Sequence, residues 1–321
     1  MITSMRILIG YDGSDGSNAA IADLPRAGLP RDVEAVVMSV ADVWPHLAAS
    51  NNYEPLTENK LITLPPAVAN AHRLAAQALA DARSLAEGGA KRVREQFPAW
   101  KVTAEACGDS PYRGLVLKAD RWRPDLIVVG SHGRSAVGRM VLGSVSQNVL
   151  AHAVCSVRVA RRPEDATKLA DEPPRIVVGI DGSPDAAAAV SAVAQRAWPK
   201  GAEVRVIAAV DDRAASLSVY AYGPPMTAFA AAAGAPDDKA WAKKATGQVV
   251  EELRGAGLSA TPFVLHGDAK RVLIDAGREW KADCIFVGAK GHSRMERFLL
   301  GSVSAAVAAR ADCTVEVVRT P

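Results

Sequence analysis

Short, almost continuous apolar runs alternate along the chain with longer segments of helical pattern. In the first half of the chain the apolar runs span residues 6–11, 34–40, 101–107, 126–130 and 156–160. Because they are rich in β-branched residues and apolar at consecutive positions, they predict parallel strands buried on both faces. The segments between them predict helices at residues 66–97, 112–121 and 144–152. This alternation predicts an α/β fold, in which a five-stranded, doubly wound parallel sheet carries helices on both faces.

The pattern occurs twice. Residues 6–20, RILIGYDGSDGSNAA, match residues 175–189, RIVVGIDGSPDAAAA, and residues 125–160 match residues 283–318. The copies are 175 − 6 = 169 residues apart at the first match and 283 − 125 = 158 at the second, so the first copy holds 11 extra residues in its middle. A charged, proline-containing stretch at 161–174 separates the copies, as a linker would. We predict tandem domains at 1–162 and 173–321, with the extra residues in a surface segment.

Each copy has a glycine and an aspartate after its third apolar run, Gly108-Asp109 in the first and Gly267-Asp268 in the second. Glycine gives the backbone freedom to turn, and aspartate is a preferred N-cap of helices. We therefore expect the two third strands to end identically, with Asp109 and Asp268 capping the helices that follow.

A glycine-rich loop follows the fourth apolar run in both copies. Glycines at the carboxyl end of a parallel strand let the backbone turn sharply and approach a ligand closely. The final Gly-Ser pair opens a helix, whose free N–H groups and dipole favour an anion. The loop therefore predicts a phosphate site, and the alternative is that its glycines serve only tight turns. The pattern is G-x2-G-x9-G-S, made by Gly130, Gly133 and Gly143-Ser144, and again by Gly288, Gly291 and Gly301-Ser302.

Other candidate residues lie at the same carboxyl edge of the predicted sheet. Asp12 and Asp181 follow the first strand of each copy, where a carboxylate could accept from a ribose hydroxyl or hold a metal ion bound to phosphates. The alternative is that each caps the next helix. Val40 and Ala209 end the second strands, where they could contact an adenine ring. Basic residues in the loops could offset phosphate charge or serve only solubility: Arg134, Arg139, His292, Arg294 and Arg297.

Charge and cysteine content narrow the class of protein. The net charge is 38 − 35 = +3, without the basic clusters typical of nucleic-acid binding. The chain opens without a secretory apolar region, and no run of 18 apolar residues follows, so we expect a cytoplasmic protein with no membrane partner. The four cysteines show no metal-ligand spacing and predict buried free thiols: Cys107, Cys155, Cys284 and Cys313.

Other nucleotide and hydrolase motifs are absent from the sequence. It contains neither G-x4-G-K-[ST] nor G-x-G-x-x-G, and no nucleophile elbow or H-E-x-x-H. His132 could act as a base in the first loop, but Lys290 takes its place in the second, and one chemistry at two sites rarely tolerates this change. We therefore predict no catalytic residue, and the metal ligands stay open.

Together these residues resemble the universal stress protein family, and the duplication resembles its tandem two-domain members. The glycine pattern, followed by an apolar helix and a V-x-V strand, is the mark of the family's ATP-binding branch. The resemblance implies a Rossmann-like (adenine nucleotide alpha hydrolase-like) fold and ATP as the ligand, with Mg²⁺ as a candidate companion. The implied contacts are Asp12, Val40, Val129, Gly130, Gly133, Gly143, Ser144 and Val145 in the first copy, and Asp181, Ala209, Val287, Gly288, Gly291, Gly301, Ser302 and Val303 in the second.

The second copy departs from this pattern in two places. Its loop reads G-A-K-G instead of G-S-H-G, and Ala209 replaces a valine, so we expect ATP at both sites and leave the equality of their affinities open. The fifth strand of this family pairs domains, and neither SVRVA nor TVEVV contains proline. We expect the two copies to pair with each other, while a homodimer of the whole chain stays open.

Three functions follow from these features. In the first, which we favour, ATP occupancy sets the conformation or partner binding of a stress-response protein, with little or no turnover. In the second, the protein is a slow ATPase or nucleotidyl transferase that uses Asp12 or Asp181 with a divalent metal. In the third, it is a non-catalytic scaffold with vestigial loops.

Overall fold

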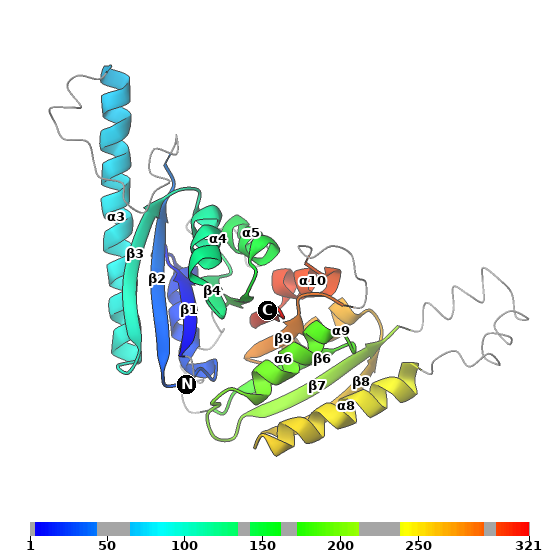
Figure 1. Cartoon of the computed structure of the whole chain (residues 1–321). Helices are drawn as coiled ribbons and strands as arrows, with labels where there is room; N and C mark the ends of the chain where they lie inside the picture. Colours follow the sequence, from blue (N-terminus) through cyan, green and yellow to red (C-terminus); the bar gives the residue numbers. More distant parts are fainter. Residues whose placement is uncertain are drawn as a thin grey trace, which may run out of the picture. The chain divides into compact units, whose positions relative to one another are not determined.

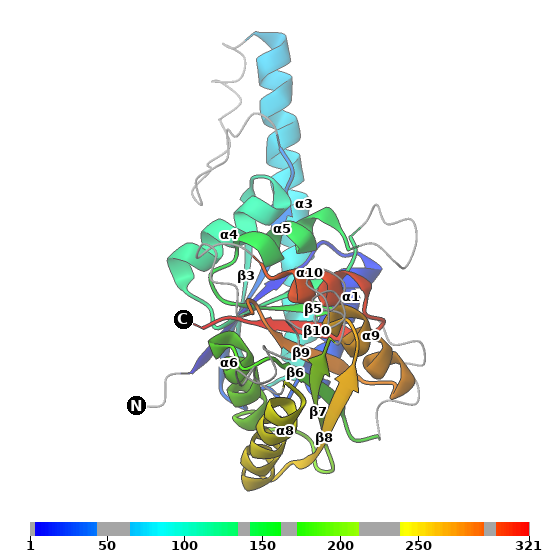
Figure 2. The same ribbon diagram turned by 90° about the vertical axis from the view of Figure 1, so that its right-hand side faces the viewer.

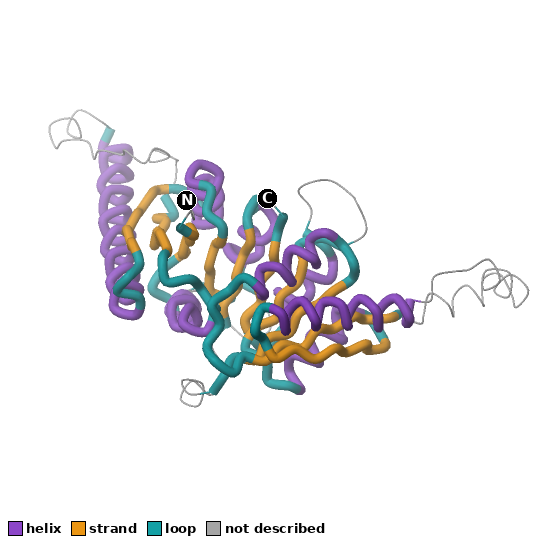
Figure 3. The backbone as a smooth tube through the Cα atoms, turned by 60° about the horizontal axis from the view of Figure 1, so that its bottom comes forward, coloured by secondary structure: helices purple, strands orange, loops and turns teal. Residues whose placement is uncertain are grey.

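Two compact units make up the chain, Met1–Arg162 and Pro163–Thr320. The computed structural model describes residues 4–43, 65–133, 142–161, 172–211, 238–291 and 300–320. Within each unit strands and helices alternate along the chain, and helices cover the sheet (Figures 1 and 3).

The first unit contains a parallel sheet in the order β3-β2-β1-β4-β5. Helices α1 and α3 pack together on one face, and α4 and α5 lie side by side on the other (Figures 1 and 2). The strands are β1 Met5–Gly10, β2 Val33–Ala41, β3 Lys101–Gly108, β4 Leu126–Gly130 and β5 Ser156–Ala160. The helices are α1 Asp15–Asp23, the short 3-10 helix η1 Leu24–Arg26, α3 Pro66–Gln96, α4 Pro111–Trp122 and α5 Ser144–His152.

The second unit repeats this arrangement in the order β8-β7-β6-β9-β10. Helices α6 and α8 pack together, as do α9 and α10. Its strands are β6 Arg175–Ile180, β7 Glu203–Val210, β8 Ser259–His266, β9 Cys284–Gly288 and β10 Thr314–Val318. Its helices are α6 Pro184–Ala194, α8 Asp238–Gly255, α9 Ala269–Glu279 and α10 Ser302–Arg310.

The predicted doubly wound parallel sheet is confirmed in both units. Ile7, Leu8 and Ile9 are consecutive and all fully buried, which requires cover on both faces of the sheet. Every element predicted in the first copy agrees with the structure to within one residue at each end. Helix α1 was expected only as the helix that Asp12 might cap and was given no bounds, because its nine residues are mostly small and show no clear apolar stripe.

The extra residues of the first copy lie between its second and third strands. Ala41 pairs with Gly108 in the first unit, and Val210 pairs with His266 in the second. The units are thus offset by 210 − 41 = 169 residues at the second strand and by 266 − 108 = 158 at the third. The helix in this connection has 31 residues in α3 and 18 in α8.

The prediction that the two Gly-Asp pairs end the third strands identically is wrong, although the strands themselves end at equivalent residues, Gly108 and His266. The backbone amides of Asp109 and Gly267 make the same bond, to the carbonyls of Ala41 and Val210 at 3.0 and 2.9 Å. Asp109 therefore matches Gly267, and the two Gly-Asp pairs are displaced by one residue. Gly267 has a φ of +127°, which explains why glycine stands there.

The same displacement changes the helix caps. Asp268 is the N-cap of α9 and accepts from the Lys270 amide, as predicted. Asp109, however, precedes the N-cap of α4, which is Ser110. Because the fixed φ of Pro111 suits the first helical position, α4 begins one residue later than the Gly-Asp pair suggested.

Candidate functional site

The predicted site residues come together where the strand order reverses. Strands β1 and β4 are neighbours, and so are β6 and β9. In each unit the aspartate follows the first of these strands and the glycine loop follows the second. Open α/β sheets bind their ligands at the carboxyl ends of the strands at such a switch point.

The aspartates lie against the middle glycines of the loops. A Cβ placed on Gly133 would lie 3.0 Å from Oδ2 of Asp12, and one on Gly291 would lie 2.8 Å from Oδ2 of Asp181. Any side chain at these two positions would meet the carboxylate. The structure therefore brings together residues that are far apart in the sequence, and it gives the middle glycines a specific reason.

Asp12 and Asp181 do not cap the following helices, so that alternative is wrong. The caps are Ser14 and Ser183, whose hydroxyls accept from the amides of Ser17 and Ala186, both at 3.2 Å. The aspartates are themselves held by these serines, because their Oδ1 atoms accept from the serine amides at 3.0 and 2.9 Å.

The last glycines of the loops begin helices that no side chain caps among the described residues. Gly143 and Gly301 are the N-caps of α5 and α10. Their own amides donate to loop carbonyls, those of Ser131 at 2.8 Å and Ala289 at 2.7 Å. The first-turn N–H groups that follow have no acceptor within the helix, which makes each helix start a candidate anion site. Ser144 and Ser302, next along the chain, are exposed.

The first glycines of the loops have a packing role. A Cβ on Gly130 would overlap the backbone of Gly16 in α1, and one on Gly288 would lie 2.6 Å from the amide nitrogen of Ala186 in α6. These glycines therefore let the first helix of each unit reach the fourth strand. The preceding Val129 and Val287, which the resemblance also implied as ligand contacts, are only 3% and 4% exposed.

Val40 and Ala209 take part in an exchange of side-chain size. A Cβ on Gly114 of α4 would lie 2.8 Å from Cγ2 of Val40. The offset of 158 residues matches Gly114 with Val272 of α9. The larger side chain is thus on the strand in the first unit and on the helix in the second. Ala209 is one half of this exchange.

Two pairs of serines that were not predicted from the sequence hold the loops. Ser146 donates to the carbonyl of Gly130 at 2.5 Å, and the matching Ser304 donates to that of Ala289 at 2.9 Å. Ser14 and Ser183 lie 3.5 and 3.2 Å from the carbonyls of the residues before the middle glycines. The signal for both pairs was available, since the strings DGS and GSVS occur in each copy.

The remaining candidate side chains are those of His132, the four cysteines and the basic loop residues. Nδ1 of His132 lies 3.0 Å from the Ser131 hydroxyl, and its Nε2 is buried without a hydrogen-bond partner among the described residues. None of the four cysteines forms a disulfide; Cys107 and Cys284 are buried as predicted, whereas Cys155 and Cys313 are only half-buried. The five basic loop residues considered as phosphate partners lie outside the described residues.

Neither a metal cluster nor a membrane span is found in the described part of the chain. No group of three or more His, Cys, Asp or Glu side chains there is arranged to hold a metal ion. None of the helices described is long and apolar enough to cross a membrane.

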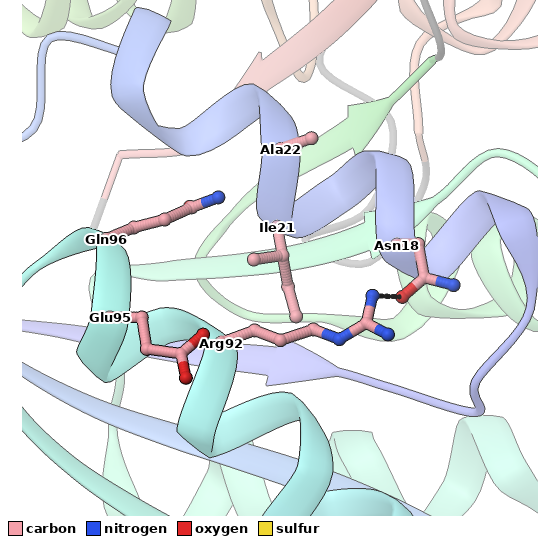
Figure 4. Close-up of a pocket in the computed structure, with 6 residues that line it drawn as sticks. All are labelled: Asn18, Ile21, Ala22, Arg92, Glu95 and Gln96. Atoms are coloured by element: carbon pink, nitrogen blue, oxygen red, sulfur yellow. Dashed lines mark hydrogen bonds between the residues drawn. The ribbon is translucent and has the colours of Figure 1, made fainter.

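A separate groove of about 400 Å³ lies between α1 and α3 (Figure 4). Arg92 crosses it and donates to Asn18 Oδ1 at 2.7 Å, and the Tyr11 hydroxyl donates to the same oxygen at 2.8 Å. The groove contains none of the predicted site residues, and the Arg92 guanidinium in it already donates to the neutral amide of Asn18. Its lining is Asn18, Ile21, Ala22, Arg92, Glu95 and Gln96.

Comparison with known proteins agrees with the fold and the duplication. A family model described as the universal stress protein family matches residues 3–161 and again residues 173–319. A universal stress protein of Mycobacterium tuberculosis is 27% identical over 322 residues, covering 98% of this chain and 96% of the relative. One from Methanocaldococcus jannaschii is 27% identical over 163 residues, covering 50% of this chain and 83% of the relative.

A solved structure has the same fold over the full length. The crystal structure of a universal stress protein from Archaeoglobus fulgidus covers 99% of both chains with a TM-score of 0.59 and 19% identity. The matches to the family model cover both units, and each unit has its own sheet and glycine loop. The chain belongs to the universal stress protein family and carries two of its domains in tandem.

Proposed function

We propose that the protein binds ATP at two sites, and that occupancy of these sites regulates its conformation or its interaction with a partner during stress, with little or no turnover. The observation that carries the proposal is the convergence, in each unit, of a carboxylate fixed by a backbone amide, a glycine whose Cβ position lies within 3.0 Å of that carboxylate, and a helix start without a side-chain cap. These are the groups that a nucleotide with a ribose and a phosphate chain requires.

The residues present fit ATP in a consistent way. The first-turn amides after Gly143 and the Ser144 hydroxyl would receive phosphate oxygens. The Asp12 carboxylate would accept from a ribose hydroxyl or contact the Mg²⁺ that accompanies the phosphates, and Val40 would meet the adenine. Asp181, Ala209, Gly301 and Ser302 would do the same in the second unit. Val145 and Val303 would contribute their amides.

Binding without turnover is favoured because the loops share no side chain suited to proton transfer. His132 stands before the middle glycine of the first loop, and Lys290 stands there in the second. A general base needs a matching geometry and pKa, and these two side chains differ in both reach and basicity. A slow ATPase and a scaffold with vestigial loops are therefore treated as outcomes of the test.

We also propose a cytoplasmic location and pairing of the two domains through their proline-free fifth strands. Arg158 on β5 is neutralised inside its own unit by Asp23 at 2.6 Å, and Glu316 on β10 by Arg196 at 2.5 Å. Each strand therefore carries no unbalanced charge that would oppose pairing. A homodimer of the whole chain would be detected by its mass in solution.

The test is the nucleotide content and binding stoichiometry of the purified protein. We expect ATP in the supernatant after denaturation, and two equivalents bound on titration. Gly143→Asp and Gly301→Asp should each remove one equivalent by steric block and charge repulsion. Gly88→Ala and Gly247→Ala, where an added Cβ meets nothing within 4 Å, are the matched controls in each unit.

Three results would change the proposal. Absence of ATP both after denaturation and on titration would leave the scaffold as the remaining function. Unchanged stoichiometry in both aspartate variants would contradict the residue assignment. Repeated turnover to ADP at about 1 per second, a rate typical of modest enzymes, would favour the ATPase.

A further inference from the structure

One carboxylate in the second unit joins the glycine loop to the segment after β10. Oδ2 of Asp185 accepts from the backbone amide of Lys290 at 3.0 Å, and its Oδ1 accepts from the Thr320 hydroxyl at 2.9 Å. The Ser183 hydroxyl donates to the carbonyl of the same Lys290 at 3.2 Å. Both backbone polar groups of Lys290, which precedes the middle glycine, are therefore held by side chains from the start of α6.

No carboxylate holds the loop in this way among the described residues of the first unit. The residue that matches Asp185 is Gly16, since 185 − 169 = 16. A Cβ on Gly16 would overlap the carbonyl oxygen of His132, the residue that matches Lys290. The first loop therefore rests directly on the backbone of α1, while the second is held away from α6 by a side chain that also bonds to it.

We propose that Asp185 is a positioning residue for the second nucleotide site, which fixes the backbone of Lys290 and thereby the approach of Gly291 to Asp181. This inference rests on the proposed binding of ATP. Asp185 acts through the loop and does not touch the ligand. Its negative charge is a disadvantage near phosphates, so its hydrogen bonds must account for any benefit to binding.

Three variants separate these effects in a Gly143→Asp background, where only the second site is available. Asp185→Ala removes both hydrogen bonds and should weaken ATP binding about tenfold. Asp185→Asn keeps an acceptor for the Lys290 amide and gives the Thr320 hydroxyl a donor, so it should bind ATP at least as tightly as the background. Thr320→Val removes only the second bond and should weaken binding about twofold. Titration calorimetry with Mg-ATP measures all three.

Hydrogen exchange of the Lys290 amide in ligand-free protein gives a readout that does not depend on ATP. We expect faster exchange in Asp185→Ala and unchanged exchange in Asp185→Asn. If Asp185 only stabilised α6 through its charge in the first turn, Asn and Ala would both lower the melting temperature and neither would alter affinity.

The outcomes distinguish this inference from the proposed function. If the background binds no ATP while Lys290 exchange still depends on Asp185, the proposed second site fails, and the role of Asp185 in ATP binding fails with it. If the background binds ATP and Asp185→Ala binds it equally well, the positioning role is overturned while the site stands.

Discussion

The two units hold the same glycine loop in different ways. In the first, the carbonyl of His132 packs where any side chain of residue 16 would begin. In the second, Asp185 occupies that place and bonds to the amide of Lys290. The groups that would face a ligand are nevertheless equivalent, because Asp12 and Asp181 lie equally close to their middle glycines.

The fold constrains some parts of the site in both units and leaves others free to differ. The aspartate, the glycines and the uncapped helix start occur in both units, and each follows from direct geometry around the site. The contacts that hold these groups in place, which we call supports, differ between the units. In the first unit the support is backbone packing of Gly16 against His132, and in the second it is the bridging carboxylate of Asp185. Gly114 and Val272 give a second example, since each complements the size of the residue on the neighbouring strand. A supporting residue can therefore differ between the units when the residue that it contacts differs as well.

The largest expected effect is that of Gly16→Ala. The new Cβ would overlap the His132 carbonyl, and the backbone on both sides leaves little room to move. We expect loss of ATP at the first site and about 3 kcal/mol less stability. Stoichiometry and denaturant unfolding measure both effects, with Gly88→Ala as the control that should keep two sites. Two equivalents of ATP in Gly16→Ala would show that the first loop does not depend on this packing.

The sequence predicts the sheet well, and it also predicts that the aspartates and loop glycines lie at the same edge of that sheet, for physical reasons. A strand covered on both faces needs consecutive apolar residues, and this pattern is local, as in Ile7 to Ile9. The loop glycines are also visible, because their spacing recurs in both copies. The Gly-Asp pairs were matched wrongly, since the two dipeptides are identical in sequence but Gly267 is structurally equivalent to Asp109 and not to Gly108.

The supports could not be predicted because they depend on contacts between residues far apart in the chain. Gly16 looks like an ordinary turn glycine until His132 is placed against it. Asp185 looks like a favourable charge in the first turn of a helix, which is also true. Nothing in the sequence indicates that Thr320 reaches the same carboxylate.

A second difference between the units is a buried ion pair of reversed polarity. Arg158 on β5 is 1% exposed and pairs with Asp23, the last residue of α1, whereas on β10 the strand residue is the acid, Glu316. Arg158→Met should lower stability by about 3 kcal/mol, because it removes the buried guanidinium that pairs with the partly buried carboxylate of Asp23. Adding Asp23→Leu should recover most of this loss. Denaturant unfolding measures the free energy of each variant.

The control for this prediction is an exposed pair. Glu251→Gln breaks an ion pair with Arg254 in α8 whose side chains are both largely exposed, and it should change stability by less than about 0.5 kcal/mol. If Arg158→Met were equally mild, the buried pair would contribute no more than a surface one. If the double variant were no better than the single, the cost would come from lost packing of Arg158.

A smaller effect tests the exchange of side-chain size. Val40→Ala should cost about 1 kcal/mol by leaving a cavity, and Gly114→Val about 1 to 3 kcal/mol by overfilling the same space. The double variant reproduces the pair found in the second unit, so its loss should be smaller than the sum by about 1 kcal/mol or more. Strict additivity would mean that the two positions do not share one space. The affinity of the double variant for ATP also shows whether alanine on this strand weakens the site.

The smallest expected effect concerns Cys107, whose match in the second unit is Leu265. Burial raises the pKa of the Cys107 thiol from 9.0 to about 11, and the nearby Asp109 and Glu105 carboxylates add to the shift. At neutral pH the thiol is protonated in both the folded and unfolded chain, so it contributes no pH dependence there. Between pH 9 and 11 the unfolded chain loses this proton first, and the stability of the first unit should therefore fall as pH rises.

Cys107→Val should remove this component while leaving the titration of all other groups in place. The difference in unfolding free energy between the wild type and Cys107→Val isolates it, measured at pH 8, 9.5 and 11. At pH 8 the raised pKa should also protect Cys107 from alkylation in the folded protein, whereas the half-buried Cys155 should react first. A difference that stays constant over this pH range, together with rapid alkylation of Cys107, would show that its thiol is in contact with solvent. Its titration would then be the same in the folded and unfolded chain, and this position, like Leu265 of the second unit, would add nothing to the pH dependence of stability.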